Sequence, residues 1–316
     1  MTTTEERVTY EEALEQWEEI ELKQQLSGRT KSVLHDGGDV APRFCLTQPE
    51  QSQQHNDGGE GGEEAWAVAD VGDISQEFDY FWKQLSQQDL RKEKAKIRDA
   101  SHIPTEPFCC VPRSVIDLHP SLEKEAEIIQ ALTKVPFDHA SAVHRGMLYA
   151  LFQRLRPSQP QPSSSVCPAW ELIGFQGDNP ATDFRGVGIF GLLQLLHLSD
   201  SYRGLCKEDL SKLYNLSLDE KQNFPLAVVG LNFTKYCIVA LRGWRLNKLI
   251  RQGGSSIGAM NAVYQGAWVQ FYRKWVKHGH AIQDFAAVSS RIEKMVLKQP
   301  NKLFRLKFLD VHADRR

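Results

Sequence analysis

One segment of the chain combines a basic side chain with a turn that would hold it in place. Residues 170–193 read WELIGFQGDNPATDFRGVGIFGLL. Glycines at four positions allow backbone conformations and close contacts that other residues resist: Gly174, Gly177, Gly186 and Gly188. Arg185 stands among them, at the mouth of a tight turn that leads into a buried helix. A guanidinium held there is planar, always charged and able to donate two parallel hydrogen bonds, so it is well placed to project into a partner.

The residues around Arg185 allow more than one role for it. Pro180, followed by Thr182 and Asp183, is typical of a helix start, where either of the last two side chains can cap free N–H groups. Arg185 could instead be structural, either paired with Asp183 or Asp178 or covering helix carbonyls. We expect Asp183 to cap or to orient a neighbour rather than to act as a base.

Other residues of this segment also have expected roles. Gln176 could position a water or contact a partner, although a backbone hydrogen bond within the turn is an equal alternative. Trp170 and Phe175 are large and apolar, and we expect both in the core. Gly186 follows the arginine directly, so its backbone freedom shapes the turn that presents the guanidinium.

Signatures of other active sites are missing from the sequence. It shows no paired carboxylates, no Ser–His–Asp signature, no metal cluster and no phosphate-binding Walker A sequence. His278 and His280 in KHGH are better explained as the end of a helix, where histidine suits the dipole. We therefore expect no metal site and no active site belonging to this chain. The six cysteines form no CxxC pair and no regular spacing, which suits a reducing compartment: Cys45, Cys109, Cys110, Cys167, Cys206 and Cys237.

The rest of the chain divides into four parts. Residues 1–26 predict an acidic amphipathic helix, and the Gly-, Ser- and Gln-rich stretch 27–65 predicts a disordered linker. Residues 66–119 predict a helical extension, with helical character over 74–100, followed by a proline-rich connector. From 120 to 310 we expect one multi-helix domain.

The composition of that domain favours an all-α fold. The alternation of Val, Ile and Thr that is typical of strands is scarce. The stretch that follows Gly188 is apolar on most sides, which predicts a helix at the centre of the core. Further helices are expected near 206–214, 224–250, 255–278 and 282–298. The breaks after or between them, QNFPL, RQGGSS, KHGH and KQPN, hold Gly or Pro where a helix ends.

Charge is balanced overall but unevenly distributed. The net charge is −2, yet residues 1–80 carry 19 Asp/Glu against 5 Lys/Arg, and residues 241–316 carry 15 Lys/Arg against 4 Asp/Glu. The basic C-terminal region can face an acidic protein, a phosphate or an anionic membrane, or it can be an ordinary solvated helix face. Aromatic and basic residues do not interleave in a nucleic-acid-binding pattern, so we expect no nucleic acid partner.

Neither a secretory signal nor a membrane span is expected. The first residues, MTTTEERVTYEEALEQWEE, are acidic and lack an apolar core. The most apolar stretch, residues 224–241, contains Pro225, Asn232, Thr234 and Lys235, which favours a buried helix over a transmembrane segment. We expect a cytoplasmic location, compatible with peripheral contact at membranes or actin-rich structures.

The segment 170–193 resembles the signature of the ELMO (engulfment and cell motility) domain family, W-x-x-x-G-F-Q-G-x-x-P-x-T-D-F-R-G-x-G-x-x-x-L. More weakly, the resemblance extends from about residue 120 to about residue 310. The early segment EEALEQW and the DNP of residues 178–180 are similar to the third paralogue of the short ELMO domain-containing proteins. Every fixed position of the signature is matched without a gap: Trp170, Gly174, Phe175, Gln176, Gly177, Pro180, Thr182, Asp183, Phe184, Arg185, Gly186, Gly188 and Leu192.

The resemblance implies GTPase-activating activity towards Arf and Arf-like small GTPases. In that family the arginine of the D-F-R-G run is the catalytic arginine, and it matches Arg185. The larger engulfment scaffolds lack this arginine, so the resemblance implies the short, activating branch, with a role in small-GTPase signalling and the cytoskeleton. It implies no cofactor, since GTP and magnesium reside on the GTPase. The supporting or partner-binding residues would be Gln176, Thr182, Asp183 and Gly186.

Two other classes of function remain beside this one. The domain could be a non-catalytic adaptor that binds a GTPase or a membrane protein, with Arg185 as an anchor. It could also be an independent enzyme, although the sequence shows no recognisable set of catalytic residues. Exposure of Arg185 separates an arginine that reaches a partner from one that is tied into the core.

Overall fold

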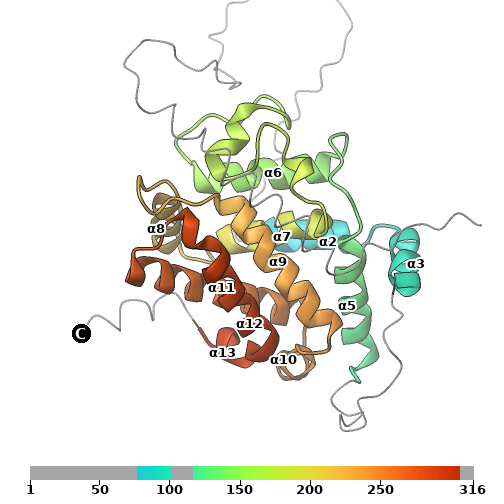
Figure 1. The fold of residues 1–316 in the computed structure, drawn as a ribbon. Coiled ribbons are helices and arrows are strands. Elements are labelled where there is room, and N and C mark those ends of the chain that lie inside the picture. The colour runs from blue at the N-terminus through green and yellow to red at the C-terminus, as the bar shows by residue number, and fades with distance from the viewer. Residues whose placement is uncertain (1–76, 101–116, 307–316) are drawn as a thin grey trace, which may run out of the picture. The chain divides into compact units, whose positions relative to one another are not determined.

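The computed structural model describes residues 77–100 and 117–306, all of which belong to the compact unit Phe44–Arg316. Every regular element within them is a helix and no strand is present there, which confirms the all-α prediction (Figure 1). The helix predicted over 1–26, the linker over 27–65 and most of the proline-rich connector lie outside the described residues. The 3-10 helices are η3 (Pro168–Ile173), η4 (Pro180–Thr182) and η5 (Ile282–Asp284). The α-helices are α2 (Glu77–Ser86), α3 (Arg91–Ala100), α5 (Pro120–Leu132), α6 (Ala142–Leu155), α7 (Gly188–Ser199), α8 (Lys207–Ser217), α9 (Leu226–Arg242), α10 (Asn247–Gly253), α11 (Ser256–His278), α12 (Phe285–Lys298) and α13 (Pro300–Phe304).

Helix α7 is the centre around which the other helices pack. All 12 of its residues are buried. It contacts α2, α5, α6, α9 and α11, and Figure 1 shows it enclosed among them. A helix that is apolar on nearly every side is stable only when it is surrounded, so the prediction of a central helix after Gly188 is confirmed.

Aromatic side chains fix α11 against α9. Trp268 meets Phe233 edge to face, with ring centroids 5.1 Å apart. Phe271 meets Phe224 in the same way at 5.0 Å. Such pairs prefer edge-to-face geometry because the negative face of one ring attracts the positive edge of the other. They hold the C-terminal helices and the central helices in one core.

The helix predicted over 224–250 is two helices, α9 and α10, that meet at 91°. The chain leaves α9 at Gly243 and turns through Trp244, whose φ is 56°. Periodicity could not reveal this break because a bulky residue rarely adopts a positive φ. Among the described residues no single helix is both long and apolar enough to cross a membrane. Only α9 and α10 taken together meet that criterion of length and composition.

The helical stretch predicted over 74–100 is also divided. Helix α2 ends at Ser86, and Asp89 accepts the backbone N–H of Arg91 at the start of α3. Three side chains of α2, Phe78, Phe81 and Leu85, are buried in the same core as α7. Helix α2 therefore contributes to the core of the helices that follow residue 117.

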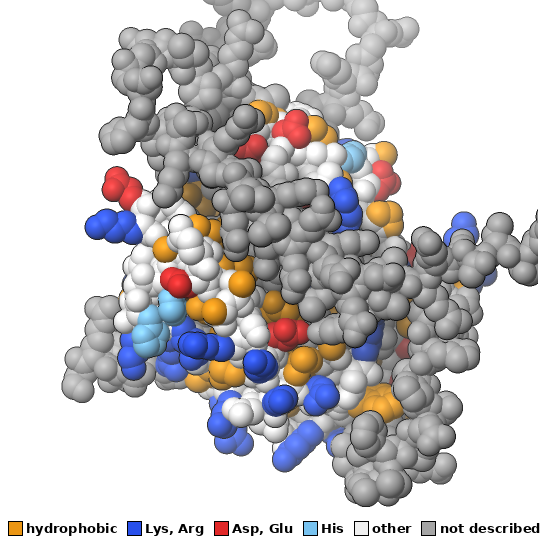
Figure 2. Space-filling view, in the orientation of Figure 1, with side chains coloured by type: hydrophobic (Ala, Val, Ile, Leu, Met, Phe, Trp, Pro, Cys, Tyr) orange, Lys and Arg blue, Asp and Glu red, His pale blue; other side chains and the backbone are white. Residues whose placement is uncertain are grey.

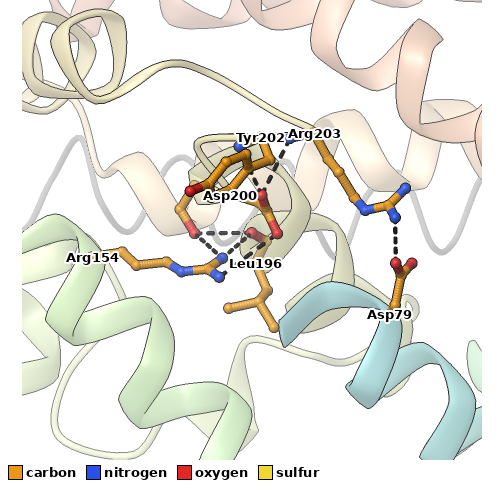
Figure 3. Close-up of polar contacts among 7 residues, drawn as sticks. Asp79, Arg154, Leu196, Asp200, Tyr202 and Arg203 are labelled. Atoms are coloured by element: carbon orange, nitrogen blue, oxygen red, sulfur yellow. Dashed lines mark hydrogen bonds and ion pairs between the residues drawn. The ribbon is translucent and has the colours of Figure 1, made fainter. Parts of the chain in front are cut away.

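Ionic contacts secure the end of α7 near α2 (Figure 3). Asp200 is fully buried, and its Oδ2 lies 3.7 Å from Nη2 of Arg154, which also donates from Nη1 to the Leu196 carbonyl. The other carboxylate oxygen of Asp200 accepts the N–H groups of Tyr202 and Arg203. The Arg203 side chain then pairs with Asp79 of α2. This network ties α2, α6 and the loop after α7 together.

Candidate functional site

Arg185 lies at the crest of a tight turn between two buried side chains. Phe184 and Val187 are buried, whereas Arg185 and Gly186 are exposed. The Phe184 carbonyl accepts the N–H of Val187 at 3.2 Å and that of Gly188 at 2.7 Å. Gly186 has φ of 84°, a value that type II turns require at this position and that glycine adopts without strain. The turn thus presents the arginine to solvent from a fixed backbone.

The guanidinium of Arg185 has no hydrogen bond and no ion pair with residues 77–100 or 117–306. The alternative of a structural arginine required a pair with Asp183 or Asp178 or a contact with helix carbonyls. None of these contacts exists in that part of the chain. Its charge reaches Asp183 only as the weakest of four influences on the pKa of that carboxyl.

An aromatic cluster supports the turn from below. Phe184 stacks on Phe137 with centroids 5.7 Å apart and meets Phe175 edge to face at 5.6 Å. Trp170 is fully buried and donates from Nε1 to the Ser164 carbonyl at 3.2 Å. The prediction that Trp170 and Phe175 belong to the core is confirmed.

The backbone of the segment is fastened to two neighbouring helices where glycine is required. A Cβ on Gly174 would lie 2.2 Å from the amide nitrogen of Leu226, the first residue of α9. A Cβ on Gly188 would lie 2.5 Å from the Leu132 carbonyl oxygen at the end of α5. The Ile189 N–H donates to the Val135 carbonyl at 2.8 Å. The segment that carries Arg185 therefore cannot shift without moving α5 or α9.

Asp183 closes the loop that precedes the arginine. Its side chain is buried, and Oδ2 accepts the backbone N–H of Gln176 at 2.7 Å. Thr182 donates from Oγ1 to the Asn179 carbonyl at 2.9 Å and lies 3.4 Å from Oδ1 of Asp183. Burial raises the pKa of Asp183 to about 6, against the lowering effects of the Gln176 N–H, the Thr182 hydroxyl and the charge of Arg185.

The prediction that Thr182 or Asp183 caps a helix is wrong. Residues 180–182 form only the short helix η4, whose cap is Asn179, since its side chain accepts the N–H of Ala181. Helix α7 begins later, and Val187 precedes it without a side-chain cap. An asparagine directly before a proline is itself a helix-start signal, and it could have identified Asn179 as the cap.

The predicted site residues fall into two groups. Thr182, Arg185 and Gly186 are exposed, so all three are open to a partner. Asp183 is buried. Gln176 is half-buried, and its backbone N–H donates to the Asp183 carboxylate. Sequence reasoning missed Phe137, which supports the turn from a loop about 50 residues earlier, because no local pattern links the two segments.

The described residues hold no group of three or more His, Cys, Asp or Glu side chains that could bind a metal ion. His278 is the last residue of α11, and Gly279 ends the helix in the left-handed conformation with φ of 61°. His280 lies with Nδ1 3.2 Å from Oδ2 of Asp284. The interpretation of KHGH as a helix end is confirmed.

Comparison with known proteins places this sequence in a family. The sequence model of the ELMO/CED-12 family matches residues 127–289. ELMO domain-containing protein 3 of Mus musculus is 30% identical over 194 residues, which cover 61% of this chain and 49% of the relative. ELMO domain-containing protein 2 of Mus musculus is 36% identical over 114 residues, which cover 36% of this chain and 37% of the relative.

A more distant organism carries a similar protein. ELMO domain-containing protein B of Dictyostelium discoideum is 29% identical over 182 residues, which cover 57% of this chain and 61% of the relative. The matched part spans about half the length of the ELMO domain-containing protein 3 relatives. No solved structure matches the chain.

Proposed function

Because the chain belongs to the ELMO/CED-12 family, we propose that it is a GTPase-activating protein for Arf or Arf-like small GTPases, with Arg185 as the arginine finger supplied in trans. Family membership supports a regulatory role connected with GTPases. Beyond that role, we propose that the GTPase belongs to the Arf family and that Arg185 acts as the arginine finger. The regulator itself has no active site, works in the cytoplasm and leaves GTP and magnesium on its partner.

The observation that carries the proposal is an unpaired guanidinium on a rigid turn. Phosphoryl transfer to water builds negative charge on the γ-phosphate and on the bridging oxygen. A guanidinium can donate two parallel hydrogen bonds to these oxygens and keeps its charge at every physiological pH. Arg185 is exposed and has no competing partner among the described residues, so no ion pair with that part of the chain must break before it enters a GTPase.

The surrounding residues have defined roles in this proposal. Asp183 and the Gln176 N–H hold the loop, while Phe184 and Val187 anchor the two sides of the turn in the core. This rigidity matters because a finger that is already positioned loses little conformational entropy when it enters the transition state. An arginine finger is worth about 10³–10⁵ in rate, or roughly 4–7 kcal/mol.

The experiment that tests the proposal measures GTP hydrolysis by a panel of purified Arf and Arf-like GTPases, with and without this protein. We expect stimulation of at least one member of the panel, and no stimulation of Ras- and Rho-type GTPases measured in parallel. Binding to a GTP-loaded Arf-like GTPase without faster hydrolysis would favour the non-catalytic adaptor instead.

A further inference from the structure

The C-terminal helices carry a concentration of unbalanced positive charge. Between residues 241 and 306 the chain has twelve Lys or Arg residues and two Asp or Glu residues. Ten of the twelve basic side chains are exposed. Figure 2 shows Lys and Arg gathered over the lower part of the molecule, where Figure 1 places α10, α12 and α13.

Helix α12 separates its apolar and basic residues onto opposite faces. Val288, Ile292 and Val296 are buried in the core. The exposed residues Arg291, Lys294 and Lys298 recur at helical spacing and share the outer face. Glu293, which is half-buried, is the acidic residue of α12, so the three exposed cations outnumber the acidic charge on this helix.

Trp244 interrupts this basic region with an exposed aromatic ring. It follows the end of α9, 39% exposed, between Gly243 and Arg245. The Trp244 N–H donates to the Leu241 carbonyl, and the Arg245 N–H donates to the Ala240 carbonyl. This is the Schellman arrangement that ends many helices, in which the residue in Trp244's place is usually glycine.

The backbone conformation of Trp244 is therefore unfavourable for its side chain. Its φ is 56°, and no other non-glycine residue in the described ranges has a positive φ. Glycine would make the same turn without strain. Strain of this kind is typically retained where the side chain has a function, and here the strained residue is a tryptophan that faces solvent.

Two contacts position the arginines that flank Trp244 in the sequence. Nη2 of Arg242 lies 3.3 Å from Oγ1 of Thr133, next to Lys134. Nη1 of Arg245 donates to the Leu297 carbonyl at 3.1 Å, next to Lys298. The pKa of Lys134 lies below its usual value, first through desolvation and then through the positive charges of Arg242 and Lys96. A nearby anion would relieve this repulsion.

We propose that this surface, formed by Arg242, Trp244, Arg245, Lys248, Lys294 and Lys298, docks the protein on an anionic lipid bilayer. The basic side chains contact lipid phosphates and carboxylates, and the Trp244 indole inserts among the headgroups, where an amphipathic ring is favoured. An ordinary solvated helix face needs no strained tryptophan. An acidic protein segment would be matched by the charges alone, whereas the exposed indole favours a surface with an apolar layer beneath its charges.

The test uses the entire 316-residue chain and sedimentation with two kinds of vesicle. One consists of phosphatidylcholine, and the other contains about 30% phosphatidylserine as the anionic lipid. We expect binding only to the second kind, and weaker binding when salt rises to about 0.5 M. Lys294→Ala with Lys298→Ala should lower the partition coefficient by about 10- to 30-fold. The matched control, Lys207→Ala with Lys221→Ala, removes the same charge from exposed positions elsewhere and should leave binding unchanged.

Trp244→Gly separates a role in docking from a role in folding. Glycine suits the turn, so the melting temperature should stay the same or rise, while the lipid partition coefficient should fall by about tenfold or more. Tyr202→Ser removes another exposed aromatic residue outside the surface and should not affect lipid binding. Equal binding to both kinds of vesicle would overturn the proposal, as would unchanged binding of the Trp244→Gly variant. Saturable capture of a peptide with the sequence of residues 1–26, without vesicle binding, would assign the surface to the acidic segment and also overturn it.

Discussion

Replacing Asp183 with asparagine tests whether burial beneath the arginine turn disfavours the ionised form of this carboxyl group. The substitution removes the charge and keeps an oxygen that can accept the Gln176 N–H. Burial raises the pKa of Asp183 from 3.8 to about 6. The folded protein therefore binds a proton more tightly than the unfolded chain, and Asp183 favours folding most at low pH. A shift of about two pKa units corresponds to about 3 kcal/mol, which is lost as pH rises from about 3 to about 7.

The assay is urea unfolding of the natural protein and the Asp183→Asn variant at a series of pH values. The free energy of unfolding of the natural protein minus that of the variant should fall by about 3 kcal/mol between about pH 3 and pH 7. Subtracting the variant cancels the other titrating groups. A difference that stays flat over this range, or that rises with pH, would show that hydrogen bonds and the charge of Arg185 outweigh burial. The reasoning about this carboxylate would then be refuted.

Three further predictions concern the scaffold and are tested by urea or thermal unfolding. Leu85→Ala should lower the free energy of unfolding by about 2–5 kcal/mol because this side chain of α2 is fully buried, whereas Tyr80→Ala on the exposed face should change it by about 0.5 kcal/mol or less. Asp200→Ala should cost about 3–5 kcal/mol because it leaves a buried arginine without its counter-charge. Gly174→Ala should be more destabilising than Gly177→Ala, since both have positive φ but only the former forces a Cβ into the backbone of α9; an equal loss would contradict that contact.

Much of the scaffold could be predicted because its signals are local. The stretch after Gly188 is apolar on most sides, and only burial at the centre of a helical protein satisfies such a pattern. The ends of α11 and α12 follow from Gly279, which adopts the left-handed conformation that ends many helices, and from Pro300, which cannot continue the preceding helix. Trp170 and Phe175 could be placed in the core by their size and apolarity alone.

The errors have a common physical origin. The break between α9 and α10 depends on Trp244 adopting a conformation that its own chemistry disfavours, so no propensity could predict it. Asp183 accepts the Gln176 N–H rather than capping a helix end, and this contact joins residues seven positions apart across an irregular loop. The support of Phe184 by Phe137 is likewise a contact between distant segments. Such choices are made by tertiary packing, which a reading of neighbouring residues cannot supply.

The central proposal is tested most directly by single-turnover GTP hydrolysis by an Arf-like GTPase. The measurement compares the rate stimulated by the natural protein with the rate stimulated by its Arg185→Lys variant. Lysine keeps the charge but cannot make the two parallel hydrogen bonds. We expect the stimulated rate to fall by about two or more orders of magnitude, with melting temperature and binding to the GTP-loaded GTPase largely retained. Arg291→Lys, the same substitution at an exposed position of α12, serves as the control and should stimulate normally. Near-normal stimulation by the Arg185→Lys variant would contradict the assignment of Arg185 as the arginine finger.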